Sequence, residues 1–267
     1  ETVEDELAEA PALQTISSGR LKGEKFHPWL ERKPIQLTIL ATVAILIGGI
    51  IQIVPTIMVK SNIPTITSVK PYTPLELQGR DLYIREGCVG CHSQMVRPFR
   101  SEVERYGPQG KAGEFVYDHP FLWGSKRTGP DLLRVGGKYN DNWHFNHFWD
   151  PQAVSKGSIM PGYKWLFDNE AMDISMTQKK MEAMKTLGVP YTDEQIANGQ
   201  KDLRTQALKI EESLKSDPDF VKSYDESKKK AEAKGVKFVP MNEREIVALI
   251  AYIQRLGTDI KVKDNSK

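Results

Sequence analysis

The stretch CVGCH, residues 88–92, decides how this chain of 267 residues folds. It contains both cysteines of the chain, Cys88 and Cys91, and His92 follows the second one directly. This C-x-x-C-H spacing is typical of covalent haem c attachment, in which two thiols add to the vinyl groups of a haem and the histidine ligates the iron. The sequence therefore predicts one covalently bound haem c with His92 as the proximal iron ligand.

Two other uses of a C-x-x-C pair are a thioredoxin-like redox site and half of a zinc site. A structural zinc site needs further ligands at matching spacing, and the chain has no third cysteine. A thioredoxin-like pair is expected near a βαβ pattern, which the sequence does not show. Both are therefore weaker interpretations of residues 88–92 than haem attachment.

A membrane-spanning helix is predicted upstream of this motif. Residues 37–59 read LTILATVAILIGGIIQIVPTIMV and contain no charged residue. At about 1.5 Å per residue, a helix of this length exceeds the roughly 30 Å hydrocarbon core of a bilayer. A buried soluble helix rarely runs this long without charge, and a signal peptide is shorter and lies nearer the N-terminus. We therefore expect a single transmembrane helix over residues 35–60, in contact with the lipid bilayer.

The charges that flank this helix predict its orientation. Five lysines and arginines lie between residues 20 and 33, whereas only Lys60 and Lys70 follow the helix within a similar distance. The positive-inside rule then makes residues 1–34 a cytoplasmic tail and places residues 61–267 on the periplasmic side. Bacteria attach haem c on the periplasmic side, so the haem motif and the flanking charges predict the same orientation. We predict a single-pass protein of the bacterial inner membrane.

Two helices are predicted to bracket the outer domain. The first begins at residues 73–76, Thr-Pro-Leu-Glu, a capping-box pattern, and leads into the haem motif. The second lies near the C-terminus, where Asn242 and Glu245 form a capping pair and Gly257 follows the last turn. This arrangement resembles the class I cytochrome c fold, in which the first and last helices cross at a glycine and an aromatic residue. The candidates for the crossing are Gly79, Tyr83 and Tyr252.

The segment between the two helices divides into two parts. Residues 97–165 are rich in glycine, proline and aromatic residues, which suits loops around a flat apolar cofactor. Residues 166–240 are predicted to be a charged helical insertion, with a helix beginning at Thr192 by the same capping logic. Its lysine-rich residues 216–235 are interpreted as part of a solvated helical hairpin, with a protein-docking surface as the alternative. The fold class is therefore mainly α, a transmembrane helix followed by a cytochrome c-like domain with an insertion.

The second axial ligand decides whether a haem carries electrons or binds gases. Met160, in the segment SIMP at residues 158–161, follows a loop region and precedes a proline and the closing helix. Class I cytochromes c place their ligand methionine at a comparable position. Seven other methionines are less suitable by position, namely Met58, Met95, Met172, Met176, Met181, Met184 and Met241. We therefore predict His92 and Met160 as the two metal ligands.

Other residues are alternative or supporting contacts of the haem. The histidine alternatives to Met160 are His119, His144 and His147. Residues 128–132, TGPDL, resemble the cytochrome c segment whose proline carbonyl accepts the N–H of the proximal histidine, a role for Pro130, with an ordinary turn as the alternative. Four arginines are candidates for the haem propionates, with surface ion pairs as an equal alternative: Arg97, Arg100, Arg127 and Arg134. Arg127 is included among the predicted cofactor-binding residues.

Together these segments resemble the mono-haem cytochrome c subunit of cbb3-type cytochrome c oxidases. The resemblance covers residues 33–165. It rests on the segments IVPT (53–56), PYTPLELQGRD (71–81), EGCVGCHSQ (86–94), YDHPFLWGSKRTGPDL (117–132) and SIMP (158–161). The charged segment after residue 169 is longer than this family leads us to expect.

The resemblance implies a non-catalytic, electron-transfer subunit of an oxidoreductase complex. Such a subunit receives electrons from a di-haem cytochrome c subunit or a soluble cytochrome c and passes them to haem b of the catalytic haem-copper subunit, where O₂ is reduced. The alternatives are a membrane-anchored cytochrome c of another respiratory complex and a haem-based sensor or peroxidase-like enzyme. A net charge of +2 gives no reason to expect a nucleic-acid partner.

Overall fold

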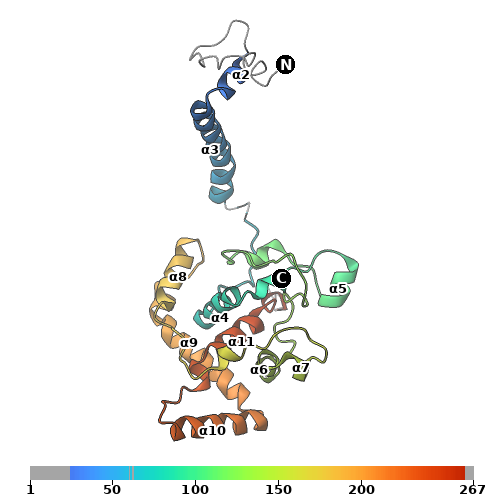
Figure 1. Ribbon diagram of the computed structural model, residues 1–267, viewed down its shortest axis with the longest axis vertical. Coiled ribbons are helices and arrows are strands. Elements are labelled where there is room, and N and C mark those ends of the chain that lie inside the picture. Colours follow the sequence, from blue (N-terminus) through green and yellow to red (C-terminus); the bar gives the residue numbers. More distant parts are fainter. Residues whose placement is uncertain (1–24, 60, 62, 262–267) are drawn as a thin grey trace, which may run out of the picture. The chain divides into compact units, whose positions relative to one another are not determined.

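The computed structural model describes residues 25–59, 61 and 63–261. Within these residues all regular structure is helical and no β-strand is found (Figure 1). The chain divides into two units, Glu1–Ile63 and Pro64–Lys267. One long apolar helix lies in the first unit and a helical domain forms the second, which confirms the predicted fold class.

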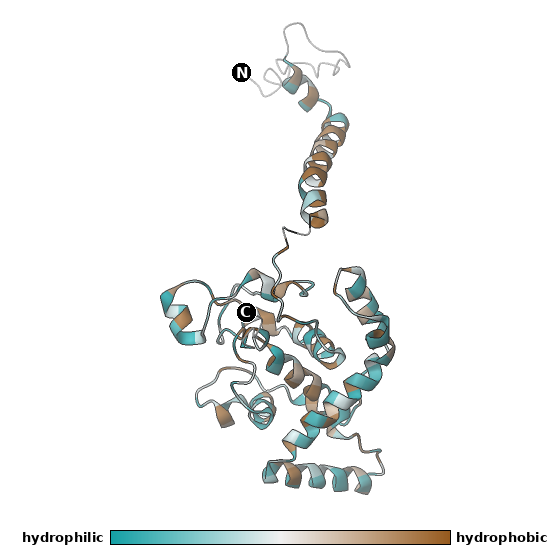
Figure 2. Cartoon of the chain, turned by 180° about the vertical axis from the view of Figure 1, so that it is seen from behind, coloured by the Kyte–Doolittle hydropathy of each residue, from teal (hydrophilic) through white to brown (hydrophobic). Residues whose placement is uncertain are grey.

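The first unit contains a short helix, α2 (Phe26–Glu31), and the long helix α3 (Pro34–Met58). Figure 2 shows mostly hydrophobic residues along α3, and none of its residues is buried within the unit. Its 25 residues are long and apolar enough to cross a membrane, as predicted from residues 35–60. Three basic residues of the orientation argument, Arg20, Lys22 and Lys60, lie outside the described residues.

Helix α4 (Pro74–Arg85) opens the core of the second unit and begins as its sequence predicts. The Thr73 hydroxyl accepts a hydrogen bond from the Glu76 N–H at 3.3 Å, and the Glu76 carboxylate accepts one from the Thr73 N–H at 2.8 Å. This reciprocal capping box satisfies two N–H groups that would otherwise lack a partner at the helix end. The helix then leads directly into the short 3₁₀ helix η2 (Cys88–Gly90).

The closing helix α11 (Glu245–Arg255) forms as expected, but its predicted N-terminal cap is wrong. Asn242 lies in a 3₁₀ turn, η5 (Met241–Glu243), which removes it from the position where its side chain could reach the first free N–H groups. The helix instead starts after Arg244, whose side chain gives no cap. At the other end Gly257 follows with φ +67°, a conformation that glycine adopts without strain, as predicted.

Helices α4 and α11 pack against each other near the centre of the domain (Figure 1), and they cross at Gly79. A Cβ atom at this position would overlap the carbonyl group of Ala248 and lie 2.8 Å from the Tyr252 Cβ. The Tyr83 and Tyr252 rings pack 5.4 Å apart at the same crossing, and both are buried. The predicted crossing at a glycine and two tyrosines is therefore confirmed.

The region predicted as loops contains several short helices. They are α5 (Arg100–Tyr106), η3 (Ala112–Phe115), α6 (Asp141–Trp149), α7 (Pro151–Val154) and η4 (Lys164–Phe167). The Asn140 side chain caps α6 by accepting the Trp143 N–H at 2.8 Å. Sequence analysis missed α6 because aromatic and histidine side chains occupy most of its circumference and leave no simple apolar stripe.

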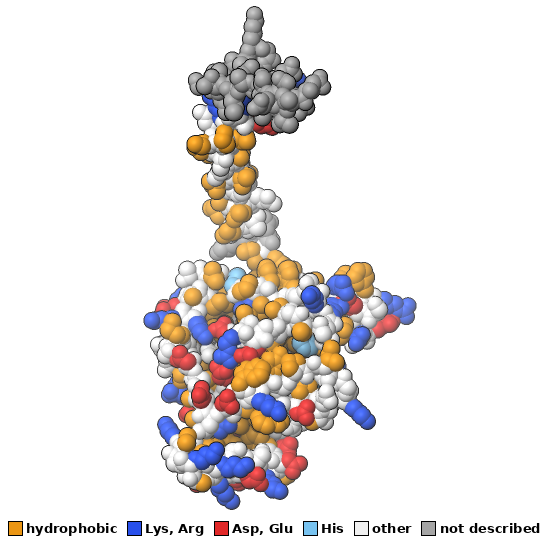
Figure 3. All heavy atoms as spheres, viewed as in Figure 1, with side chains coloured by type: hydrophobic (Ala, Val, Ile, Leu, Met, Phe, Trp, Pro, Cys, Tyr) orange, Lys and Arg blue, Asp and Glu red, His pale blue; other side chains and the backbone are white. Residues whose placement is uncertain are grey.

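The charged segment forms α8 (Thr177–Thr186), α9 (Asp193–Leu214) and α10 (Pro218–Ala233). The predicted capping box at Thr192 is present, with Gln195 as its partner. Helix α9 is more than a surface addition, because Leu203, Ala207 and Leu214 belong to the same core cluster as α4 and α11. Helix α10 buries only Phe220, and Figure 3 shows basic and acidic side chains intermixed at this end of the domain. The mixed charge gives this surface no single sign.

Candidate cofactor site

The two cysteines lie at the end of α4, where the chain turns sharply. Gly87 has φ +71° and allows the turn from α4 into η2, which carries Cys88. Cys88 is buried and Cys91 is exposed, and both are free thiols. Burial raises the pKa of Cys88 to about 12, so this thiol is protonated at neutral pH.

Both cysteines contribute to the wall of one large cavity, of about 480 Å³. Its other lining residues come from the loop after His92, from α6, from the segment around Met160 and from α11. Most of the wall is hydrophobic, including Leu132, Val135, Phe148 and Ile253. A concave, largely apolar site with a few polar groups is the usual form of a cofactor site.

His92 is held in place by a hydrogen bond to the Gly-Pro segment. Its Nδ1 lies 2.8 Å from the Pro130 carbonyl oxygen, so Nδ1–H donates and Nε2 is left without a proton. Burial lowers the pKa of His92, an effect that the bond to Pro130 opposes. A neutral imidazole with a free Nε2 is the form that ligates a metal ion.

Gly129 braces the imidazole from the side, a role that sequence analysis did not identify. A Cβ atom at Gly129 would lie 2.7 Å from the His92 Nδ1 and would overlap the ring. The Gly129 N–H also donates to the Cys91 carbonyl oxygen at 3.0 Å. The signal available in the sequence was the glycine directly before Pro130, since a close approach to another group is a common reason for glycine.

Met160 is brought into the same cavity as His92 and the two cysteines. Its position is fixed by the segment SIMP, in which the Met160 N–H donates to the Ser158 hydroxyl at 3.2 Å. Four other methionines are buried in hydrophobic clusters, namely Met172, Met181, Met184 and Met241. Met95 and Met176 do not line the cavity, and Met58 belongs to the first unit.

Two of the three alternative histidines also line the cavity. They are His144 and His147, whereas His119 does not. Burial lowers the pKa of His144 to about 4, and it lowers the pKa of His147 as well. Both imidazoles are therefore neutral at pH 7. His147 is further held by stacking on Trp143, with the ring centres 4.6 Å apart.

None of the four candidate arginines lines the cavity. Each pairs with a carboxylate instead: Arg97 and Arg127 with Glu102, Arg100 with Glu104 and Arg134 with Glu114. The ion-pair alternative therefore describes the position of all four side chains. Arg127 lies behind the Gly-Pro segment, where it contacts Ser93 rather than the cavity.

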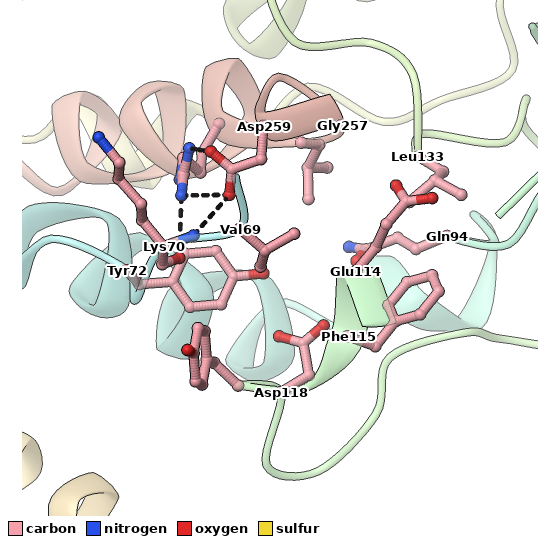
Figure 4. A pocket seen from close by; sticks show the side chains of 13 residues that line it. Val69, Lys70, Tyr72, Gln94, Glu114, Phe115, Asp118, Leu133, Gly257 and Asp259 are labelled. Atoms are coloured by element: carbon pink, nitrogen blue, oxygen red, sulfur yellow. Dashed lines mark hydrogen bonds and ion pairs between the residues drawn. The ribbon is translucent and has the colours of Figure 1, made fainter. Parts of the chain in front are cut away.

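A second hollow lies beside the start of the domain and is far smaller, about 40 Å³ (Figure 4). Figure 4 shows Asp259 bonded to the Lys70 backbone N–H at 3.0 Å, a contact that ties the C-terminal end of the domain to its first residues. A volume of this size holds a water molecule or two but no macrocycle. Another hollow, of about 390 Å³, is lined by some of residues 101–106 and by residues 127–130, but by no cysteine, histidine or methionine. The cavity of about 480 Å³, which both cysteines and His92 line, is therefore the candidate cofactor site.

Comparison with known proteins identifies a family that covers most of the chain. A family model described as cytochrome c oxidase, mono-heme subunit/FixO, matches residues 27–260. The match extends well beyond residues 33–165 and includes α8, α9 and α10. No curated protein matches the chain.

Proposed function

The chain belongs to the FixO family, the mono-haem electron-transfer subunits of cbb3-type cytochrome c oxidases, and we propose that it carries one haem c bound covalently in the large cavity. In this proposal Cys88 and Cys91 form the two thioether bonds. His92 and Met160 would hold the iron.

The observation that supports this proposal is the convergence of four side chains on one cavity. Cys88, Cys91 and His92 come from the segment after α4, whereas Met160 comes from the loop before η4. The apolar wall and the volume of about 480 Å³ suit a flat hydrophobic cofactor. A neutral His92 imidazole and a thioether are the ligand pair of electron-transfer cytochromes c, so the donor set fits a haem.

When bound, the haem supplies one-electron redox chemistry. The chain's own residues position the cofactor and tune it. The Pro130 carbonyl accepts the His92 Nδ1–H and makes the imidazole a stronger electron donor, and Gly129 leaves the ring the space it needs. The apolar wall keeps water away from the iron, and burial together with methionine ligation raises the reduction potential.

As a subunit of an oxidase, the chain works with other oxidase subunits. We propose that electrons arrive from a di-haem cytochrome c subunit or a soluble cytochrome c. They then leave to haem b of the catalytic haem-copper subunit. Two cavity-lining residues are exposed, Cys91 and Ile159, and the second is 79% exposed. Their exposure supports direct electron transfer from the haem to a partner subunit. One edge of the cavity therefore reaches the protein surface.

Helix α3, the one helix of the described residues that is long and apolar enough to cross a membrane, is consistent with a single-pass membrane anchor. We propose that its N-terminal end faces the cytoplasm and that the haem domain lies in the periplasm of a bacterial inner membrane. Lys25, Arg32 and Lys33, which precede the apolar run by twelve residues or fewer, support this orientation by the positive-inside rule. Periplasmic attachment of haem c requires the same orientation.

Stopped-flow spectroscopy of the purified oxidase tests this function. When the reduced complex is mixed with O₂, haem c of this chain is expected to be oxidised within one turnover, which takes milliseconds to about a second for typical enzymes. The control is the same complex with its oxygen site blocked by cyanide, in which haem c should stay reduced. Haem c that stays reduced after the catalytic subunit of the same complex has been oxidised by O₂ would contradict the proposed electron route.

A further inference from the structure

We propose that Asp131 and Arg127 are positioning residues for His92, which lock the segment after this histidine to the loop that presents the Pro130 carbonyl and thereby set the reduction potential. The proposal rests on the haem site described above. Neither side chain lines the cavity, so neither is expected to touch the haem. Their effect has to pass through the hydrogen bond between His92 and Pro130 and through the electrostatic field.

The Asp131 carboxylate is the centre of this arrangement. Its side chain is 0% exposed. One oxygen accepts from the Ser93 hydroxyl at 2.6 Å and from the Met95 N–H at 2.9 Å, and the other accepts from the Leu133 N–H at 2.9 Å. A single buried carboxylate therefore ties the residues that follow His92 to the residues that follow Pro130.

Arg127 also bonds to Ser93 and Met95, the two residues after His92 that Asp131 contacts. Its Nε donates to the Ser93 hydroxyl at 2.7 Å, and its Nη2 donates to the Met95 carbonyl oxygen at 2.8 Å. Nη2 also lies 3.4 Å from the Asp131 carboxylate. Ser93 thus donates to the carboxylate and accepts from the guanidinium, which fixes its hydroxyl completely.

Glu102, on α5, fixes Arg127 in turn. Its two oxygens pair with the two terminal nitrogens of the guanidinium, at 2.6 and 2.8 Å. Hydrogen bonding to Arg127 lowers the pKa of Glu102 to about 2, so this carboxylate remains charged near neutral pH. A bidentate pair restrains a guanidinium far more strongly than a single contact does.

Backbone hydrogen bonds also join the segment around His92 to the segment around Pro130. The Gly129 N–H donates to the Cys91 carbonyl oxygen at 3.0 Å, and the Leu132 N–H donates to the Ser93 carbonyl oxygen at 2.8 Å. The bond from His92 to Pro130 lies between these two links. The distance from the imidazole to the Pro130 oxygen is therefore determined by the whole assembly rather than by one turn.

Two effects of Asp131 on the haem have the same sign. The oxidised haem carries one more positive charge than the reduced haem, so a buried carboxylate nearby stabilises the oxidised form. A firmly held Pro130 carbonyl makes His92 a stronger donor, which also favours the oxidised form. Loss of the Asp131 charge is therefore expected to raise the reduction potential.

The test compares Asp131→Asn with a matched control in the complete oxidase. Asparagine keeps the size of the side chain but turns an NH₂ group toward N–H and O–H donors. The control is Glu114→Gln, which breaks the ion pair between Glu114 (labelled in Figure 4) and Arg134. The control is matched in burial, because both of these side chains are 6% exposed. Arg134 follows Leu133 in the same loop, but its side chain donates to the carbonyls of Pro108 and Gln109 and to Glu114, and not to the residues that follow His92.

Redox titration of haem c gives the readout, together with the haem c content of each variant. Asp131→Asn is expected to keep its haem and to raise the equilibrium constant for reduction about tenfold, which is about 59 mV for one electron. Glu114→Gln is expected to lower thermal stability without changing the potential. Ser93→Ala, which removes one link and no charge, is expected to give a smaller rise.

Each outcome decides a different point. A haem-loaded Asp131→Asn variant with an unchanged potential, or an equal rise in Glu114→Gln, would overturn the positioning proposal. If Asp131→Asn fails to assemble, Ser93→Ala decides, because a rise supports the proposal and an unchanged potential overturns it. Absence of haem c from the unmodified chain would instead overturn the proposed function.

Discussion

Replacement of Met160 by alanine is expected to remove the absorption band of methionine–iron(III) ligation from the oxidised protein. The thioether is a soft ligand that favours reduced iron, so its loss also lowers the reduction potential. Because the choice of axial ligand spreads haem potentials over about 0.8 V, we expect a fall of roughly 100 mV or more. Near-infrared absorption of the oxidised oxidase and a redox titration measure both effects.

Met176→Ala is the matched control for this experiment. Met176 is 44% exposed and does not line the cavity, so its removal should leave the band and the potential unchanged. A band that survives in Met160→Ala would show that another residue ligates the iron. A new spectrum of two nitrogen ligands in Met160→Ala would mean that the sixth position is open to His144 or His147, which line the same cavity.

The largest effect on stability is expected at Gly79, where α4 and α11 cross. Gly79→Ala introduces a methyl group that overlaps the Ala248 carbonyl and lies 2.8 Å from the Tyr252 Cβ, so the two helices have to separate. Overpacking of this kind costs about 1–3 kcal/mol and sometimes more, which exceeds the gain of about 1 kcal/mol from the higher helix propensity of alanine. Thermal unfolding of the purified oxidase should show early loss of the haem domain.

Gly199→Ala provides the control, since Gly199 is also a buried glycine inside a helix, α9. Its new methyl group meets mainly the Met181 sulfur, at 2.9 Å, in a flexible side chain that is able to move aside. We therefore expect a change of stability of less than about 1 kcal/mol, because the small overlap is offset by the helix propensity of alanine. Equal destabilisation by both substitutions would contradict the close crossing at Gly79.

Local signals in the sequence predicted the frame of the domain well. The capping boxes at Thr73 and Thr192 depend on residues within one helical turn. Gly79 was visible as a glycine inside a predicted helix, although the groups that it contacts, Ala248 and Tyr252, are distant in the chain. The cap predicted at Asn242 was wrong because it depends on more than the local sequence. The spacing was correct, but a 3₁₀ turn that only the tertiary packing determines took up this residue.

The surroundings of the site were harder to predict, because they depend on partners that are distant in the chain. An arginine beside a haem motif has the same local pattern whether it contacts a propionate or a carboxylate. Arg127 pairs with the carboxylate of Glu102, which lies on α5, a helix that has no clear sequence signal. Apolar residues of α9 recur at helical spacing, namely Leu203, Ala207, Ile210 and Leu214, but this pattern did not specify that they would pack against α4 and α11.

Mass spectrometry of the denatured chain tests the central claim most directly. If Cys88 and Cys91 hold a haem c, the chain purified from active oxidase should be heavier than its polypeptide by the mass of one haem. After proteolysis the added mass should lie on the peptide that contains residues 88–92. An unmodified chain in an active complex, or a haem that dissociates on denaturation, would contradict the account.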